Sequence, residues 1–269
     1  MFGFFHKEGK NVNDDEQSYL QLRSYVNSQE DNIFDPEVYD KAQNNDPAAQ
    51  VRIAQYYKDI EGNLNEAMRL LKKAADQKFG PAYTELGYIY RNKGKKDQAR
   101  DCFEKALKYG DAEGAYAIAS EQEYADQNFK EAFKYYKIAA EMGDADAQAK
   151  TGLFLLNGKG TEKNESIAFS WMKKAVDQEN YRIAGYCLAR CYLNGIGTEK
   201  NEVKGFEILR NTALAGYDEK TVELLILCYE KGIGTAKSRK NAGFWKRIKD
   251  EQNGLMNELV NEILEEKDF

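Results

Sequence analysis

The chain has 269 residues, of which 42% are hydrophobic and 31% are charged, and its formal net charge is −6. This charge balance argues against a nucleic-acid-binding protein, because a phosphate backbone attracts a basic surface. The single histidine, His6, leaves little room for zinc sites or for mechanisms that use a histidine base, so we expect neither an enzyme nor a bound metal or cofactor. The chain has only three prolines and is rich in strong helix formers, which predicts an all-α protein.

The N-terminal residues 1–14 are mostly polar after Phe5 and predict a flexible leader. The apolar start is too short for a secretory signal, and no stretch reaches the roughly 18 apolar residues of a membrane span. We therefore expect a cytoplasmic protein that does not contact a membrane. Residues 15–45 predict two capping helices, whose apolar positions are Tyr19, Leu20, Leu22, Tyr25 and Val26 in the first and Val38, Tyr39 and Ala42 in the second.

The segment 46–254 repeats one pattern of two helices six times. The first helix of each repeat has a small residue at a fixed position, except for a threonine in the last: Ala49, Ala82, Ala115, Ala147, Ala184 and Thr221. The second helix has a small residue of its own: Ala67, Ala99, Ala132, Ala168, Gly205 and Ala242. Successive members lie 32 to 37 residues apart. A period of this length indicates stacked copies of one helix pair.

Further positions recur in step with this period. An aromatic residue or leucine follows eight places after the first small residue in every repeat but one: Tyr57, Tyr90, Glu123, Leu155, Tyr192 and Tyr229. We expect Tyr124 to take the place that Glu123 leaves, and Glu121 and Glu123 to lie on a solvated face. Second helices are expected to end near Gly80, Gly110, Gly143, Asn180, Gly216 and Gly254, because these residues tolerate a left-handed backbone. Asp46, Asp111 and Asp144 are expected to cap the next helices.

Three glycine loops lie 37 residues apart in the last three repeats: Gly158-Lys159-Gly160, Gly195-Ile196-Gly197 and Gly232-Ile233-Gly234. A phosphate-binding loop needs a preceding strand and a longer glycine signature, and here a helix precedes each loop. We therefore expect them to be structural turns.

The cysteines Cys102, Cys187, Cys191 and Cys228 are expected to be free. Equivalent positions on neighbouring stacked helices lie about 8–10 Å apart, farther than the roughly 7 Å that a disulfide tolerates. Cys187 and Cys191 lie one turn apart and could in principle hold a soft metal. No CxxC motif or nearby histidine supports that, so we expect small buried apolar side chains.

The run Gly143–Gln148, the loops 157–160 and 194–197, and the helix 168–175 resemble the Sel-one-like repeat, a relative of the tetratricopeptide repeat. The resemblance covers about residues 46–254 and is strongest in the fourth and fifth repeats. The first three repeats lack the glycine loop and are closer to plain tetratricopeptide repeats. The resemblance implies a right-handed α-solenoid of about six helix-turn-helix repeats. We expect residues 255–269 to add a C-terminal capping helix, because their apolar residues recur at helical spacing.

In tetratricopeptide proteins the first helix of each repeat lines the concave wall. Carried over to this chain, that arrangement implies a wall of Tyr88, Arg91, Glu121, Tyr124, Leu153, Tyr186, Arg190 and Leu227. Tyrosine and arginine are enriched among the residues that dominate binding energy, although they could also simply cover the packed helices.

The wall and the repeat architecture together favour a scaffold or adaptor, of a kind typical of bacteria, that binds a partner protein or an extended peptide in its groove. One alternative is an immunity-type inhibitor of a cognate toxin, and the least favoured alternative is a small-molecule enzyme. The partner's identity and the oligomeric state stay open.

Overall fold

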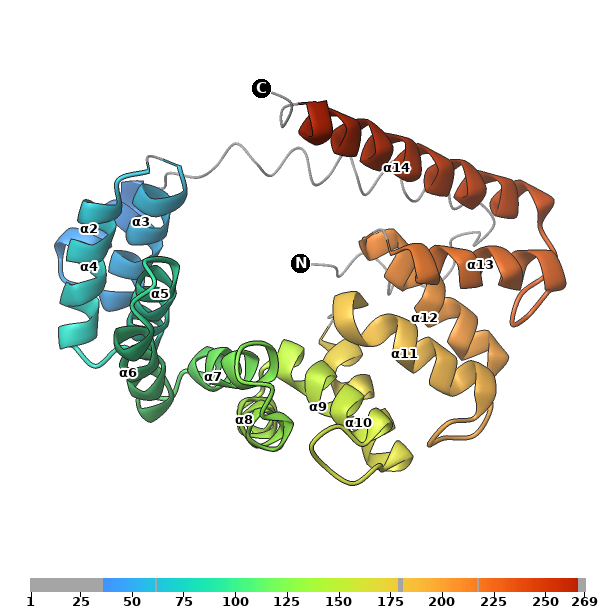
Figure 1. Ribbon diagram of the computed structural model, residues 1–269, viewed down its shortest axis with the longest axis horizontal. Helices are drawn as coiled ribbons and strands as arrows, with labels where there is room; N and C mark the ends of the chain where they lie inside the picture. The colour runs from blue at the N-terminus through green and yellow to red at the C-terminus, as the bar shows by residue number, and fades with distance from the viewer. Residues whose placement is uncertain (1–35, 61, 179–180, 217, 266–269) are drawn as a thin grey trace. The chain divides into compact units, whose positions relative to one another are not determined.

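The computed structural model describes residues 36–60, 62–178, 181–216 and 218–265, and every regular element in these ranges is an α-helix (Figure 1). The chain divides into two compact units between Asn164 and Glu165. We call the described residues before this boundary the first unit and those after it the second unit. The expected leader and the expected helix around Tyr19 lie outside the described residues, whereas the second expected capping helix is present as α2 (Pro36–Gln43).

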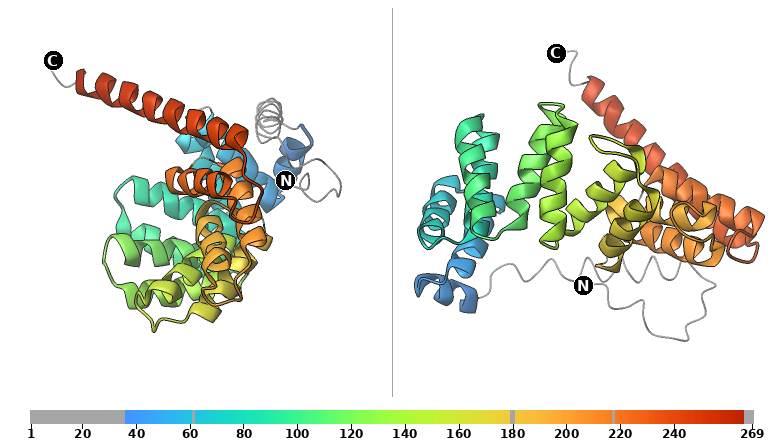
Figure 2. Two further views of the ribbon diagram at one scale, coloured as in Figure 1. Left: turned by 90° about the vertical axis from the view of Figure 1, so that its right-hand side faces the viewer. Right: turned by 90° about the horizontal axis from the view of Figure 1, so that it is seen from below.

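The first unit consists of α2, three helix pairs and the first helix of a fourth pair. The pairs are α3 (Pro47–Asp59) with α4 (Leu64–Asp76), α5 (Gly80–Asn92) with α6 (Lys96–Lys108), and α7 (Ala112–Tyr124) with α8 (Phe129–Glu141), and the last helix is α9 (Ala145–Asn157). Consecutive helices pack against each other as hairpins (Figure 2). We call α3, α5, α7 and α9 the A helices and α4, α6 and α8 the B helices. The A helix α5 also contacts the neighbouring A helices α3 and α7 directly.

The second unit continues the alternation. Its helices are α10 (Glu165–Asp177), α11 (Tyr181–Asn194), α12 (Glu202–Ala215), α13 (Glu219–Lys231) and α14 (Arg239–Glu265). Consecutive helices again pack together, and α14 packs along α13. Among the helices described, none is both long and apolar enough to cross a membrane.

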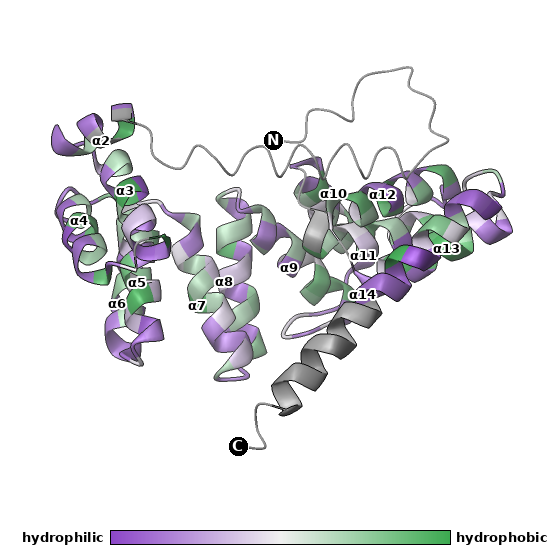
Figure 3. Cartoon of the chain, turned by 90° about the horizontal axis from the view of Figure 1, so that it is seen from above, coloured by the Kyte–Doolittle hydropathy of each residue, from purple (hydrophilic) through white to green (hydrophobic). Residues whose placement is uncertain are grey.

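The repeated small residues lie where helices approach one another. In the first unit the shared feature is complete burial, with 0% exposure at Ala67, Ala74, Ala82, Ala106, Ala115, Ala132, Ala139 and Ala147. A side chain no larger than a methyl group lets two backbones pack closely, and larger residues such as Phe103 and Leu71 fill the space between the pairs. Figure 3 shows hydrophobic and hydrophilic residues interspersed along these helices.

Polar side chains define where the helices begin. The expected caps are confirmed, since Asp46 accepts from the Ala49 N–H at 2.7 Å, Asp144 from the Ala147 N–H at 2.6 Å and Asp111 from the Glu113 N–H at 3.3 Å. Asparagine takes the same role at the starts of α4, α8 and α12, which the sequence pattern did not predict: Asn63, Asn128 and Asn201. Each cap satisfies a backbone donor that would otherwise lack a partner.

The glycine loops are structural turns. Gly160 has a φ of +67°, and a Cβ atom on it would lie 2.1 Å from the Phe129 carbonyl oxygen at the start of α8. Gly197 and Gly234 meet the starts of α10 and α12 in the same way, through the carbonyl oxygens of Glu165 and Glu202. Glycine is therefore required at the second position of each loop for two reasons: the left-handed backbone and this close approach.

Two expected helix ends are wrong. Gly80 is the first residue of α5, and the left-handed residue before it is Lys78, with a φ of +61°. Gly254 lies inside α14, which runs without a break past the expected boundary at residue 254. The expectation for Gly110 and Gly143 is confirmed, with φ values of +82° and +103°.

The four cysteines are free, as expected, and three of them are buried: Cys102, Cys191 and Cys228. Burial raises the pKa of each of these three thiols to about 11. They are therefore protonated at neutral pH and behave as small apolar side chains.

Candidate functional site

Five of the eight predicted wall residues belong to the first unit and project from its A helices. Tyr88 and Arg91 lie on α5, Glu121 and Tyr124 on α7, and Leu153 on α9. We call these five residues the A-helix face. The other three belong to the second unit, with Tyr186 and Arg190 on α11 and Leu227 on α13. The structure therefore groups the predicted wall residues into two sets, one in each unit.

Tyr88 and Arg91 form a preorganised pair. The Arg91 guanidinium lies 4.7 Å from the centre of the Tyr88 ring, and the ring packs edge-on against Phe103 at 5.3 Å. The Tyr88 hydroxyl donates a hydrogen bond to Glu113 of the next A helix. Burial, together with this bond to an acidic group, raises the pKa of the Tyr88 phenol. The side chain is thus held on three sides before any partner arrives.

Glu113 lies in an acidic environment. Burial raises the pKa of its carboxyl group, the bond from Tyr88 opposes this change, and the nearby carboxylates of Asp144, Asp111 and Asp146 raise the pKa further. Among the described residues, no Lys or Arg forms an ion pair with Glu113. The start of α7 is therefore a place where additional positive charge would be favourable.

The end of α7 differs from the sequence prediction. Tyr124 does not take the buried position, because it is 66% exposed, while Glu123 is buried at 8% exposure. The Glu123 carboxylate accepts from the Tyr136 hydroxyl at 2.8 Å, from Lys159 Nζ at 2.9 Å and from Lys150 Nζ at 3.0 Å. The expectation of a solvated acid at this position is wrong, because three donors replace the water that the carboxylate loses.

This cluster of Glu123, Tyr136, Lys150 and Lys159 connects two neighbouring repeats. Tyr136 comes from α8, Lys150 from α9 and Lys159 from the glycine loop that follows α9. Burial alone would raise the pKa of Glu123, but the hydrogen bonds from Lys159, Lys150 and Tyr136 lower it below its usual value. The carboxylate is therefore charged over a wider pH range than a free glutamate.

Lys150 also holds the exposed tyrosine. Its ammonium group donates to the Tyr124 hydroxyl at 2.6 Å and lies 4.9 Å from the centre of the Tyr124 ring. Although Tyr124 is open to solvent, its ring is thereby positioned by the buried cluster beneath it. Glu121 is less constrained, since its carboxylate accepts a long hydrogen bond from Arg100 of α6, at 3.4 Å. Leu153 is half-buried on α9.

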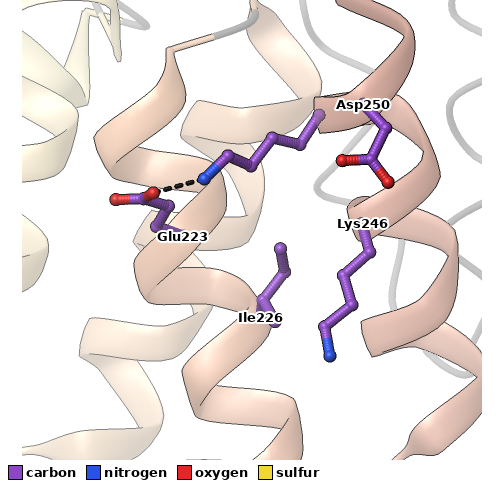
Figure 4. A pocket seen from close by; sticks show the side chains of 5 residues that line it. Glu223, Ile226, Lys246 and Asp250 are labelled. Atoms are coloured by element: carbon purple, nitrogen blue, oxygen red, sulfur yellow. Dashed lines mark hydrogen bonds and ion pairs between the residues drawn. The ribbon is translucent and has the colours of Figure 1, made fainter. Parts of the chain in front are cut away.

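In the second unit, Arg190 lies 5.5 Å from the Tyr186 ring centre, and Leu227 is 40% exposed. The Tyr–Arg pair thus recurs, with a longer separation. A hollow of about 330 Å³ lies between α13 and α14, among Glu223, Ile226, Lys246, Lys249 and Asp250 (Figure 4). Lys249 crosses it to pair with Glu223 and, at 3.4 Å, with Glu219. Lys249 lies seven places after Ala242, at the position that Ala74, Ala106 and Ala139 take in the first three repeats, and it ties α14 to α13.

A second hollow, of about 360 Å³, lies in the first unit among α4, α5 and α6. Tyr83, Leu86 and Cys102 line it, and an ion pair between Asp101 and Lys105, at 2.7 Å, lies on its rim. Within the described ranges, no group of three or more His, Cys, Asp or Glu side chains could hold a metal ion. Neither hollow brings together groups that resemble a catalytic arrangement.

The residues that the sequence analysis missed are the inter-repeat partners: Glu113, Tyr136, Lys150 and Lys159. Their signal is present in the sequence as a departure from the repeat pattern. Glu123 interrupts the aromatic row, and Lys159 replaces the isoleucine found in the other two glycine loops. A buried acid requires a nearby cation, so the two departures could have been paired.

The family model of the Sel1 repeat matches residues 47–79, 112–144, 145–180 and 181–217, just over half of the chain. A tetratricopeptide repeat model matches residues 80–109, the second repeat. This division refines the expectation that the first three repeats are closer to tetratricopeptide repeats, because the first and third match the Sel1 model.

Two curated relatives are similar over part of the chain. A sel1-like repeat-containing protein, L21, of Acanthamoeba polyphaga mimivirus is 29% identical over 128 residues, 46% of this chain and 24% of that protein. The F-box protein At1g70590 of Arabidopsis thaliana is 30% identical over 101 residues, 37% of this chain and 29% of that protein. The chain thus spans less than a third of the length of these relatives.

Among solved structures, c5321, a protective antigen of uropathogenic Escherichia coli with the Sel1-like repeat fold, superimposes with a TM-score of 0.67 and 25% identity over 81% of this chain and 48% of that one. A Sel1 repeat protein of Oxalobacter formigenes gives a TM-score of 0.62 with 23% identity over 87% and 96%. These likenesses support an all-helical fold of paired helices, as found in Sel1 and tetratricopeptide solenoids.

Proposed function

Because the chain belongs to the Sel1 repeat family, we propose that it is a scaffold or adaptor that docks a partner protein or an extended peptide on the A-helix face. Repeat proteins of this class present a row of equivalent helices as a binding surface. The observation that carries the proposal is the Tyr88–Arg91 pair, whose ring and guanidinium are 4.7 Å apart on a helix that contacts the A helices on both sides.

The Tyr88–Arg91 pair suits binding because both side chains are preorganised. A side chain that is already fixed loses little conformational entropy when a partner binds. Tyr88 is held by Phe103 and Glu113, and Arg91 is exposed above its ring. Tyrosine and arginine are also the residue types that most often contribute a large share of binding energy.

The test is affinity capture from a lysate of the source cells, followed by mass spectrometry, with the wild-type chain and the double variant Tyr88→Ala/Arg91→Ala. We expect the variant to lose about 2 kcal/mol or more of binding free energy per dominant residue, which would remove specific partners from the captured set. A matched control is Lys108→Ala/Tyr109→Ala, a Lys–Tyr pair at the end of the B helix α6 with 5.7 Å between cation and ring.

The control should capture the same partners as the wild-type chain. Circular dichroism and thermal melting must show that both double variants remain folded. If the Tyr88/Arg91 variant is folded and captures the wild-type set unchanged, the A-helix face is not the binding surface. An immunity-type role would appear in the same experiment as one dominant partner whose enzymatic activity the chain inhibits.

A further inference from the structure

We infer that Tyr124 and Glu113, at the two ends of α7, form a site for a basic, extended segment of a partner protein. This inference rests on the proposed function and names the chemistry of the partner. It starts from Tyr124, which is 66% exposed and takes the position that Arg91 takes in the second repeat. The preceding residue, Glu123, fills the buried position that Tyr192 and Tyr229 fill in the fifth and sixth repeats, where they are 9% and 2% exposed.

The exposed ring lies next to a buried acid along the chain. The Glu123 carboxylate occupies the buried position of the aromatic row, and Tyr124, the next residue along the chain, points to solvent. An apolar residue at the buried position would avoid the desolvation of a charge. The exposed ring is then fixed by Lys150, which donates to its hydroxyl and lies against its face. A rigid, exposed tyrosine on a helix surface has the properties of a binding anchor.

The charge of α7 selects the partner. Between Asp111 and Asp126 the chain has five carboxylates and no Lys, Arg or His: Asp111, Glu113, Glu121, Glu123 and Asp126. Lys150, the cation nearest to Tyr124, is already committed to Glu123 and Tyr124, and its side chain is 14% exposed. Glu123 is buried against Lys150 and Lys159, and Glu121 accepts from Arg100. The acidic part of α7 is therefore its start, where Asp111, Asp144 and Asp146 lie near Glu113, and a basic segment complements it.

Glu113 is the second contact point. Its half-buried carboxylate has no Lys or Arg ion-pair partner among the described residues, and Asp111, Asp144 and Asp146 lie near it. Eleven residues separate it from Tyr124, which is about three helical turns, so both side chains lie on the same side of α7, about 16 Å apart along its axis. An extended segment of about five residues covers that distance.

The partner segment would contact both ends of α7. A lysine or arginine of the partner pairs with Glu113, and a side chain about five residues away packs on the exposed Tyr124 ring. The Tyr124 hydroxyl accepts from Lys150, which leaves its own proton available for a backbone carbonyl of the segment.

The test uses a display library of random peptides of about 12 residues, long enough to cover both contact points. We expect selection on the wild-type chain to enrich peptides that contain Lys or Arg. A fluorescent copy of one enriched peptide is then titrated against Tyr124→Ala, Glu113→Gln and Glu141→Gln. The last variant is the matched control, because Glu141 is an exposed acid on the B helix α8 of the same unit.

We expect Tyr124→Ala and Glu113→Gln each to weaken binding by about tenfold or more and Glu141→Gln to leave it unchanged. Raising the salt from about 0.05 M to about 0.5 M should also weaken binding, because the attraction between opposite charges is screened. Circular dichroism should show that both variants are folded, because Tyr124 is exposed and glutamine is close in size to glutamate.

Enrichment of acidic or purely apolar peptides, or no enrichment at all, would overturn the inference. So would a basic peptide whose affinity is unchanged in both Tyr124→Ala and Glu113→Gln. If that peptide is instead weakened by Tyr88→Ala/Arg91→Ala, the proposed function stands and the site on α7 is wrong. If it is weakened by none of these variants, both fail.

Discussion

Replacing Glu123 with glutamine perturbs the buried cluster without changing the size of the side chain. The carboxylate, with 7% of its side chain exposed, accepts from two ammonium groups and one phenol. Lys159 is 37% exposed and can turn to solvent, whereas Lys150 is 14% exposed and keeps a buried charge without its counterion. Hydrogen bonds to charged groups contribute about 1.5–3 kcal/mol each, and removing one partner of a buried ion pair costs about 3–5 kcal/mol.

We therefore expect Glu123→Gln to lower the free energy of unfolding by about 3 kcal/mol. This is the lower end of the range, because Lys159 can turn to solvent and recover its hydration. Urea unfolding followed by circular dichroism measures this change. The matched control is Glu121→Gln on the same helix. The Glu121 carboxylate lies 3.4 Å from Arg100, both side chains are about 30% exposed, and we expect the change to alter stability by less than about 1 kcal/mol.

The stability difference between wild type and Glu123→Gln should depend on pH. The pKa of Glu123 is lowered in the folded protein, so its stabilisation is complete above the pKa of the unfolded chain, about 4.3, and is lost as the pH falls through the lower folded value. The difference between wild type and Glu123→Gln should thus be constant at neutral pH and shrink below about pH 4. Equal losses for Glu123→Gln and Glu121→Gln, or no change with pH, would refute the account of the cluster.

Three further predictions concern packing. Thr151 is fully buried, and its hydroxyl has no hydrogen-bond partner among the residues that the structure describes, so Thr151→Val should raise the free energy of unfolding by about 1 kcal/mol; a loss would show that the hydroxyl is satisfied. Gly160→Ala should destabilise the protein more than Gly158→Ala. A Cβ atom at Gly158 would have no contact under 3.5 Å, so Gly158→Ala costs only the backbone strain of about 1–2 kcal/mol. Equal melting temperatures of the two variants would contradict this. At pH 8, iodoacetamide should alkylate the buried thiols far more slowly in the folded chain than in urea, because their pKa is about 11: Cys102, Cys191 and Cys228.

The repeat architecture could be predicted because its determinants are local. Small residues at a fixed period, such as Ala82 and Ala115, mark where helices touch, and both are completely buried. The left-handed glycines of the loops are visible in the sequence for the same reason, since no other residue adopts that backbone easily.

Helix ends were less predictable, because they depend on neighbouring helices. Gly80 resembles a helix-ending glycine, but a Cβ on it would approach the Asp111 side chain at 2.7 Å, so its small size serves packing. Gly254 is tolerated within α14, whose length shows that a single glycine does not end a helix.

The candidate site was predictable only in part. Repeat equivalence identified Tyr88 and Arg91 as neighbours on one helix, and the structure brings them together. It failed at Glu123 and Tyr124, because the burial of an acid depends on cations from other repeats, Lys150 and Lys159, that a local pattern does not connect. The choice of the A-helix face as the binding surface can be tested directly.

That test is site-specific photo-crosslinking. A photo-reactive phenylalanine analogue replaces Tyr124 in one sample and Tyr109, at the end of the B helix α6, in another, and each sample is irradiated in a lysate of the source cells. We predict a crosslinked partner protein at position 124 and none at position 109. Crosslinking at position 109 alone, or no crosslink at position 124 in a folded protein that still captures its partner, would contradict the claim that the A helices of the first unit form the binding surface.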